Sequence, residues 1–250
     1  MQLIRYTLQG NAVIIETTTG TLGLIPYAAS VIRVRYAPTA AFAAQPSLMV
    51  LALPDASVTV AVRETTDAVI VSLPKLTIRI QRATCAFTYL DSNGTLLTKE
   101  PDRGGKALIP VDVVKPVFDS DAEAYVRKDV DGVRAMRSSA QRVVDRHAFH
   151  TKLEFEWQDG EALYGLGSHE EGMLNLRGQH QYLYQQNMKV VIPVLLSTRG
   201  YGILLDSYSW MSFRDDAFGS YLWTDVDDEL DFYFIYGPEF DQIVRSFRQL

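Results

Sequence analysis

Apolar and polar residues alternate with a period of two over much of the chain. Residues 31–36 show the pattern most clearly, since apolar side chains alternate there with Arg33 and Arg35. A period of two that is rich in β-branched residues is typical of a half-buried strand. On this basis strands are predicted over residues 11–17, 31–36, 57–63, 68–72 and 76–81.

The same pattern continues in the second half of the chain. Strands are predicted over residues 107–114, 151–157, 190–196 and 201–205, and the charge-rich residues 119–146 are predicted to add one or two more. The Asn93-Gly94 pair is a strong signal for a tight hairpin. Since no helical period separates the strands, the pattern favours an antiparallel β-sandwich over a parallel sheet.

A helical period appears at the end of the chain. Four apolar residues at spacing i, i+3, i+4 and i+7 begin at Phe240, after Gly237-Pro238. This spacing predicts an amphipathic helix with proline in its first turn. We expect a mainly β domain over residues 1–236 and a short helix over residues 237–250. Because the helix has no capping glycine, we interpret the chain as a fragment that leads into a further domain.

Composition narrows the class of protein. Hydrophobic residues make up 47% and charged residues 22% of the chain, the balance of a globular protein with a core. The net charge of −6 argues against a nucleic-acid surface. Neither a secretion signal nor an 18-residue apolar run is evident. We therefore expect a cytoplasmic protein that binds neither nucleic acid nor membrane, although a mature secreted chain would begin in the same way.

Few residues point to chemistry on their own. Cys85 lies in an alternating run, so a buried and inert thiol is expected. His169-Glu170-Glu171 has metal-ligand residue types, but no second histidine at ligand spacing, so a solvated loop is favoured. The acidic residues 225–229 lack the spacing of a calcium loop, which favours a solvated turn. We predict no metal and no cofactor.

Residues 179–188, with the sequence QHQYLYQQNM, interleave amides with tyrosines. Amides both donate to and accept from sugar hydroxyls, and aromatic faces stack on the apolar side of a pyranose. The alternative is a polar hairpin whose tyrosines cover a sheet. Trp210 and Trp223 have the same two interpretations, since they would either line a glycan groove or pack against the sandwich or a missing domain.

Several short motifs follow one another in a fixed order. In that order they resemble the N-terminal domain of glycoside hydrolase family 31. The motifs are YGLG at 164–167, LNLRG at 174–178, QN at 186–187 and IPVLLSTRGYG at 192–202. Two flanking stretches, VIRVRYAP at 31–38 and DFYFIYG at 231–237, are similar to the family's early strand and to its last strand before the linker helix. The resemblance covers nearly the whole chain.

The resemblance implies a galactose-mutarotase-like β-sandwich, or supersandwich, that precedes a catalytic (β/α)₈ barrel. In the family both catalytic aspartates lie on that barrel, and neither motif is present here. No catalytic residue is therefore expected in this chain, and the chain alone should be inactive. The full-length protein would be a retaining α-glycosidase that hydrolyses or transfers α-linked glucosyl, xylosyl or galactosyl residues, with two carboxylates about 5 Å apart. Its partners would be an α-linked oligosaccharide or glycoside and its own barrel.

In the family, one loop of this domain reaches the active-site rim, and its tip usually has the sequence Asn-x-Asp. The aligned triplet here is Gln185-Gln186-Asn187, so Asn187 stands in place of the aspartate. This departure is similar to amide versions in α-xylosidase-like and transglycosylase-like subgroups. The resemblance thus implies that Asn187 contacts the sugar, with Gln186 and Met188 as neighbours.

Two other functions fit parts of the sequence. A stand-alone carbohydrate-binding β-sandwich would use the Gln/Asn/Tyr loop as its whole site. A mutarotase-like epimerase would need a histidine that faces a carboxylate across a concave sheet. The candidates are His147, His150, His169 and His180, and the sequence supports no pairing for them. A surface that normally packs against a barrel would leave an apolar patch, so self-association of the fragment is expected.

Overall fold

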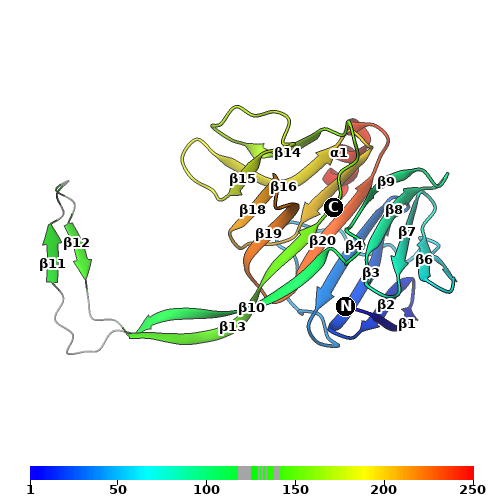
Figure 1. Ribbon diagram of the computed structural model, residues 1–250, viewed down its shortest axis with the longest axis horizontal. Coiled ribbons are helices and arrows are strands. Elements are labelled where there is room, and N and C mark those ends of the chain that lie inside the picture. The colour runs from blue at the N-terminus through cyan, green and yellow to red at the C-terminus, as the bar shows by residue number, and fades with distance from the viewer. Residues whose placement is uncertain (118–124, 129, 131, 133, 138–140) are drawn as a thin grey trace.

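The structure is a computed structural model that describes residues 1–117, 125–128, 130, 132, 134–137 and 141–250 (Figure 1). Strands make up nearly all of its regular secondary structure, and every described ladder is antiparallel. Among the described residues, no helix is both long and apolar enough to cross a bilayer.

The strands form three main sheets and one separate hairpin. The eight-stranded sheet has the order β1 (Leu3–Gln9), β2 (Ala12–Thr17), β3 (Gly20–Ala28), β4 (Val31–Ala37), β20 (Leu230–Tyr236), β17 (Tyr201–Leu205), β16 (Val190–Ser197) and β14 (Leu163–Ser168). The first five-stranded sheet has the order β5 (Ala61–Glu64), β6 (Ala68–Ser72), β7 (Leu76–Gln81), β8 (Phe87–Asp91) and β9 (Leu96–Lys99). The second has the order β10 (Lys106–Val117), β13 (Gln141–Glu154), β19 (Gly219–Asp227), β18 (Met211–Asp216) and β15 (His180–Leu183). The hairpin pairs β11 (Tyr125–Lys128) with β12 (Arg134–Arg137).

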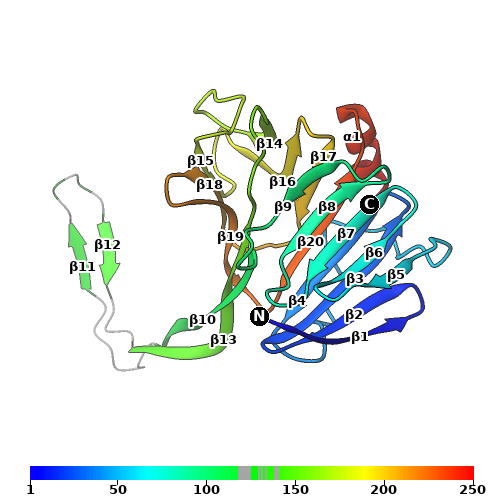
Figure 2. The same cartoon turned by 45° about the vertical axis from the view of Figure 1, so that its right-hand side comes forward.

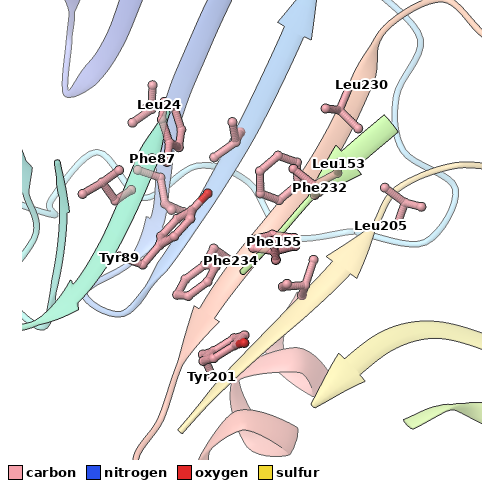
Figure 3. Packing of buried hydrophobic residues seen from close by; sticks show 14 of the residues in the cluster. Leu24, Phe87, Tyr89, Leu153, Phe155, Tyr201, Leu205, Leu230, Phe232 and Phe234 are labelled. Atoms are coloured by element: carbon pink, nitrogen blue, oxygen red, sulfur yellow. The ribbon is translucent and has the colours of Figure 1, made fainter. Parts of the chain in front are cut away.

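Both five-stranded sheets pack on one face of the eight-stranded sheet and share its core (Figures 1 and 2). Phe234 of β20 stacks on Tyr89 of β8, with ring centroids 3.9 Å apart, and on Tyr201 of β17, at 5.2 Å (Figure 3). Leu153 of β13 lies beside Phe232 in the same cluster. The predicted mainly β sandwich is therefore confirmed, with two sheets in its second layer.

The helix α1 (Phe240–Gln249) covers the opposite face of the eight-stranded sheet. Its Ile243 is fully buried against that face. The predicted place of Pro238 in the first turn is wrong, because the helix begins at Phe240 with Glu239 as its N-cap. Gly237 and Pro238 instead turn the chain against Gly200, and the Gly237 N–H donates to the Gly200 carbonyl at 2.9 Å.

Strand prediction succeeded where alternation was unbroken. The predicted strands 68–72, 76–81 and 201–205 match β6, β7 and β17, and residues 91–94 form the predicted turn between β8 and β9. The prediction over 57–63 is wrong at its start, because Asp55 Oδ1 accepts the Ser57 N–H and hydroxyl in a turn, and β5 begins only at Ala61. The prediction over 151–157 runs past the end of β13 at Glu154. Residues 118–124, 129, 131, 133 and 138–140 of the charge-rich segment lie outside the described residues.

The outer parts of β10 and β13 leave the sheet as a two-stranded arm (Figure 1). Val114 and Val144 are directly paired on this arm, and both are exposed. Pro110 and Pro116 lie on β10, the edge strand of its sheet. Proline cannot donate a ladder hydrogen bond, so these residues limit pairing of the open edge with other chains.

Cys85 is fully buried, as expected from its alternating surroundings. Burial raises the pKa of its thiol to about 11. The thiolate, which is the reactive form, is therefore scarce at neutral pH. Cys85 acts as a small apolar side chain in the core.

An ion pair between Glu100 and Lys106 is fully buried beside this core. Lys106 Nζ lies 2.5 Å from Glu100 Oε1 and 3.4 Å from the centroid of the Phe87 ring. Glu100 Oε2 also accepts the N–H groups of Phe87, at 3.1 Å, and Gly105, at 3.2 Å. The pair thus joins β8 to the loop before β10, and each charge depends on the other for its burial.

Replacing one member of this ion pair should destabilise the protein much more than replacing both members. We expect Lys106→Met to lower the free energy of unfolding by about 3–5 kcal/mol, because it leaves Glu100 buried without a counter-charge. The double variant Lys106→Met/Glu100→Leu should recover most of that loss. Urea unfolding followed by circular dichroism measures both. A double variant as unstable as the single one would contradict the argument.

Candidate functional site

The loop between β15 and β16 presents the residues singled out for sugar contact. It closes in a turn in which the Lys189 N–H donates to the Gln186 carbonyl at 3.2 Å. Met188 in this turn has a φ of 65°, a left-handed conformation that is uncommon for residues other than glycine. Such a conformation persists only where the surrounding structure fixes it.

The side chain of Gln185 holds the loop through hydrogen bonds to the backbone on the far side of the turn. Its Nε2 donates to the Lys189 carbonyl, and its Oε1 accepts the Val191 N–H at 3.1 Å. The Gln185 side chain therefore joins the part of the loop before its turn to the backbone of Lys189 and Val191 after the turn. From sequence alone Gln185 is only the first residue of an aligned triplet, since an amide that bonds to the backbone cannot be told there from one that faces solvent.

Lys189 ties the loop to another segment of the chain through an ion pair. Its ammonium lies 2.7 Å from Glu171 Oε1 and 5.7 Å from the centroid of the Tyr184 ring. The hydrogen bond from Lys189 lowers the pKa of Glu171 and raises that of Lys189. Glu170 and Glu171 are both exposed, as expected of a solvated loop pair, and Glu171 is in addition tied to a residue that lies 18 positions later.

Gln186, Asn187 and Met188 all lie exposed at the tip of this braced loop. Met188 exposes 76% of its surface. Within the described part of the chain, the side-chain amides of Gln186 and Asn187 form no hydrogen bond. Their donors and acceptors are therefore available to a ligand, and the placement of Asn187 just before a core strand agrees with the prediction.

The glycines of the YGLG motif hold the base of the loop. A Cβ on Gly167 would lie 1.9 Å from the Val190 carbonyl oxygen, and one on Gly165 would lie 2.3 Å from that of Val194. Both glycines have φ near 100°. They allow β14 to approach β16 closely at a bulge, which is a structural role.

Asn175 and Arg177 of the LNLRG motif hold the neighbouring loop. Asn175 Oδ1 accepts the N–H groups of Leu163 and Arg177, both at 3.1 Å. Arg177 Nε donates to Asp215 Oδ2 at 2.9 Å. These residues attach residues 169–179 to β14 and β18, so the motif supports the site and does not enter it.

Glu161 anchors the other end of this region. Its buried carboxylate accepts the Ser197 and Tyr201 hydroxyls at 2.5 Å each, and the Gln158 N–H at 2.6 Å. The Tyr201 pKa is raised well above its ordinary value by burial and by this carboxylate. The group is a structural network, because Glu161 engages both hydroxyls and the Gln158 N–H in the interior.

A cavity of about 380 Å³ lies beside the loop. Tyr184 and Gln185 of the loop line one side of it, and Trp210 lines another. Trp210 is 51% exposed and packs edge-on to Tyr184, with ring centroids 6.3 Å apart. The loop therefore combines free amides at its tip with aromatic surface at its base.

A second polar cluster lies on β4 and β20. Arg33 donates to both oxygens of Asp231, at 2.9 and 3.2 Å from Nε, and Arg35 Nε donates to Glu229 at 2.6 Å. Burial raises the Asp231 pKa to about 6, despite the opposing effect of Arg33. The expected solvated turn at 225–229 is wrong for Glu229, which is buried and ion-paired. A cavity of about 620 Å³ adjoins this cluster.

The four histidines are dispersed. His147 lies 2.7 Å from Asp112 on the exposed arm, and His150 lies 3.4 Å from Asp225 at the surface of the second five-stranded sheet. His169 Nε2 bonds to the Leu166 carbonyl at 2.8 Å, and His180 packs edge-on to Tyr182. The two carboxylate pairs lie between strands of one sheet, which is a surface arrangement and not the facing pair of an epimerase.

A family profile matches residues 21–213 of the chain. It is described as the glycosyl hydrolase 31 N-terminal galactose mutarotase-like domain. An alpha-xylosidase from Saccharolobus solfataricus is 33% identical over 111 residues, which cover 41% of this chain and 15% of that protein. The fold expected from the resemblance is thereby confirmed.

Solved structures agree on the fold. A GH31 alpha-xylosidase from Xanthomonas citri has a TM-score of 0.76 at 17% identity, over 97% of this chain and 40% of that one. A GH31 dextranase from Flavobacterium johnsoniae has a TM-score of 0.70 at 18% identity, over 98% of this chain and 27% of that one. The chain spans less than half the length of each relative.

If Gln185 is the internal brace, its removal should loosen the loop alone. We expect Gln185→Ala to speed amide hydrogen exchange at Val191, because the loss of two hydrogen bonds lowers the local opening free energy by about 1–3 kcal/mol. Gln186→Ala is the matched control and should leave exchange unchanged. Equal exchange in the two variants, measured by NMR, would refute the bracing role.

Proposed function

Because the chain belongs to the glycosyl hydrolase 31 N-terminal galactose mutarotase-like domain family, we propose that it is the non-catalytic N-terminal domain of a retaining α-glycosidase. Residues 1–236 form the domain, and residues 237–250 lead to a catalytic (β/α)₈ barrel. Both catalytic carboxylates belong to that barrel, where they would flank the anomeric carbon at a separation of about 5 Å. The chain's own contribution is one loop at the rim of the site.

The observation that carries this proposal is the braced loop with Asn187 at its tip. Two independent contacts hold the loop, the Gln185 clamp and the Lys189–Glu171 ion pair. A fixed loop loses little conformational entropy when it binds, so its exposed amides are suited to positioning a ligand. The tip itself stays free of internal hydrogen bonds among the residues that the structure describes.

Asn187 would act by hydrogen bonding and not by charge. A side-chain amide presents an acceptor and two donors, which match neighbouring sugar hydroxyls. It adds no negative charge near an oxocarbenium-like transition state. Its role is therefore to position the sugar, with Gln186 and Met188 lining the same tip.

An α-linked glycoside is the substrate class, and an α-xyloside is the first choice within it. The relatives named above are an α-xylosidase in two cases and a dextranase in the third. Both names describe enzymes that act on α-linked sugars or their polymers. Xylosyl and glucosyl residues are both uncharged, so the neutral amides at the loop tip suit either of them.

The chain alone should have no glycosidase activity, because both catalytic carboxylates are placed outside it. We expect no turnover of p-nitrophenyl α-xyloside, α-glucoside or α-galactoside by the purified 250-residue chain. A longer product of the same gene, which includes the barrel, should cleave at least one of them. Turnover by the pure chain, or inactivity of the long form, would refute the proposal.

In the longer enzyme, Asn187→Ala should lower kcat/KM by about 1–3 kcal/mol, or roughly 5- to 150-fold, through lost hydrogen bonds to the sugar. The exposed Gln9 on β1 provides a control, and Gln9→Ala should have no effect. Asn187→Asp, which restores the family's usual carboxylate, separates hydrogen bonding from charge. Steady-state kinetics on the preferred p-nitrophenyl glycoside give the values, and an unchanged kcat/KM in Asn187→Ala would remove this residue from the site.

A further inference from the structure

The outer face of the second five-stranded sheet carries a slot that the proposed function does not use. Ser212 of β18 lies at its centre, and its cross-strand partners are Tyr182 of β15 and Trp223 of β19. A small residue between two large aromatic residues leaves an open space above the sheet. A cavity of about 210 Å³ occupies this position, and Trp210 and Arg214 also line it.

The two aromatic walls are held in place by neighbours. Tyr182 stacks on Trp210, with ring centroids 5.7 Å apart and an interplanar angle of 28°. Trp223 stacks on His150 at 5.0 Å and 30°. Tyr182 still exposes 39% of its surface, so stacking supports this ring without covering it. The walls are therefore preformed.

The width of the slot fits one flat ring. Tyr182 and Trp223 lie on strands two positions apart in the sheet, a separation of roughly 9–10 Å. A ring between two aromatic faces needs two carbon contact distances, or roughly 7–8 Å. The space can therefore take a single ring that stacks on at least one wall.

Polar groups stand at both ends of the slot. Arg214, on the same face as Ser212, has no ion pair or hydrogen bond from its guanidinium to any residue that the structure describes. Asp225 lines the other end and keeps one oxygen free of His150, whose Nδ1 lies 3.4 Å from Oδ1. The positive charge of Arg214 and the negative charge of Asp225 leave the slot with no net charge. This favours a neutral ligand with hydroxyls over a charged one.

From this arrangement we propose that the slot is a second carbohydrate site, which holds one neutral pyranose ring against Trp223 and Tyr182. Arg214 donates to ring hydroxyls, Asp225 accepts from them, and the Ser212 hydroxyl faces the ring edge. The slot adjoins the cavity beside the Asn187 loop, since Trp210 lines both, but it lies around Ser212 and needs no barrel. Only the choice of an α-linked sugar rests on the proposed function.

The test uses the indole N–H signals of the three tryptophans in NMR spectra of the 250-residue chain. Maltotriose and isomaltotriose are the probes, and sorbitol at equal concentration controls for general polyol effects. Saturable shifts of the Trp210 and Trp223 signals are expected, whereas Trp157, which stacks on Phe155, should not respond. Phenylalanine variants of each tryptophan assign the signals.

Two variants remove the slot in different ways. Ser212→Tyr fills it from the floor, and Trp223→Ala removes one wall, so each should weaken binding of the trisaccharide at least tenfold. Phe218→Ala, which removes an exposed aromatic ring from the β18–β19 turn, is the matched control and should bind normally. Circular dichroism confirms that each variant is folded, and Ser212→Tyr serves if Trp223→Ala is not.

Several results would overturn the proposal. These are no shift with either trisaccharide, a shift that persists in Ser212→Tyr, or broadening of both indole signals with protein concentration but not with sugar. The last result would mean that a second copy of the chain covers the face. Because binding is measured without the barrel, an inactive long form would refute the proposed function and leave this result standing.

Discussion

The eight-stranded sheet depends on the pairing of β20 with β4 on one side and β17 on the other. Six of the seven residues of β20 are buried, so this strand belongs to the interior on both faces. Phe234 on one face stacks with rings from two other strands, while Tyr233 and Ile235 meet the layer that contains α1. Without β20 the strands from the first 37 residues would have no hydrogen-bonded link, within this sheet, to β17, β16 and β14.

This frame explains why the candidate site is built from short, irregular pieces. The core strands β16 and β17 fix where the loop begins, and bonds from Gln185 and Lys189 fix how it closes. Glycines 165 and 167 let β14 come close enough to support its base. Most of the motifs that mark the family are thus structural, and the residues available to a ligand are the few that the scaffold leaves free.

Most of the fold could be predicted, because unbroken alternation and turn residues are local properties. The long-range contacts could not, because sequence spacing does not show which partners meet. Lys189 and Glu171 lie 18 residues apart, and Arg33 and Asp231 lie 198 apart. For the same reason the position of Asn187 on a loop rim could be predicted, whereas the Gln185 clamp that holds the loop and the slot around Ser212 could not.

The late position of β20 in the chain has a consequence for synthesis. Strand β4 ends at Ala37, whereas its partner begins at Leu230. A ribosome that adds 5–20 residues per second would leave this edge of β4 unpaired for roughly 10–40 s. During that interval Arg33 and Arg35 have not yet met Asp231 and Glu229, so they remain free cations on an open strand edge. Before they pair with these carboxylates, the two arginines place positive charge on the open strand, and this charge disfavours its pairing with a neighbouring nascent chain.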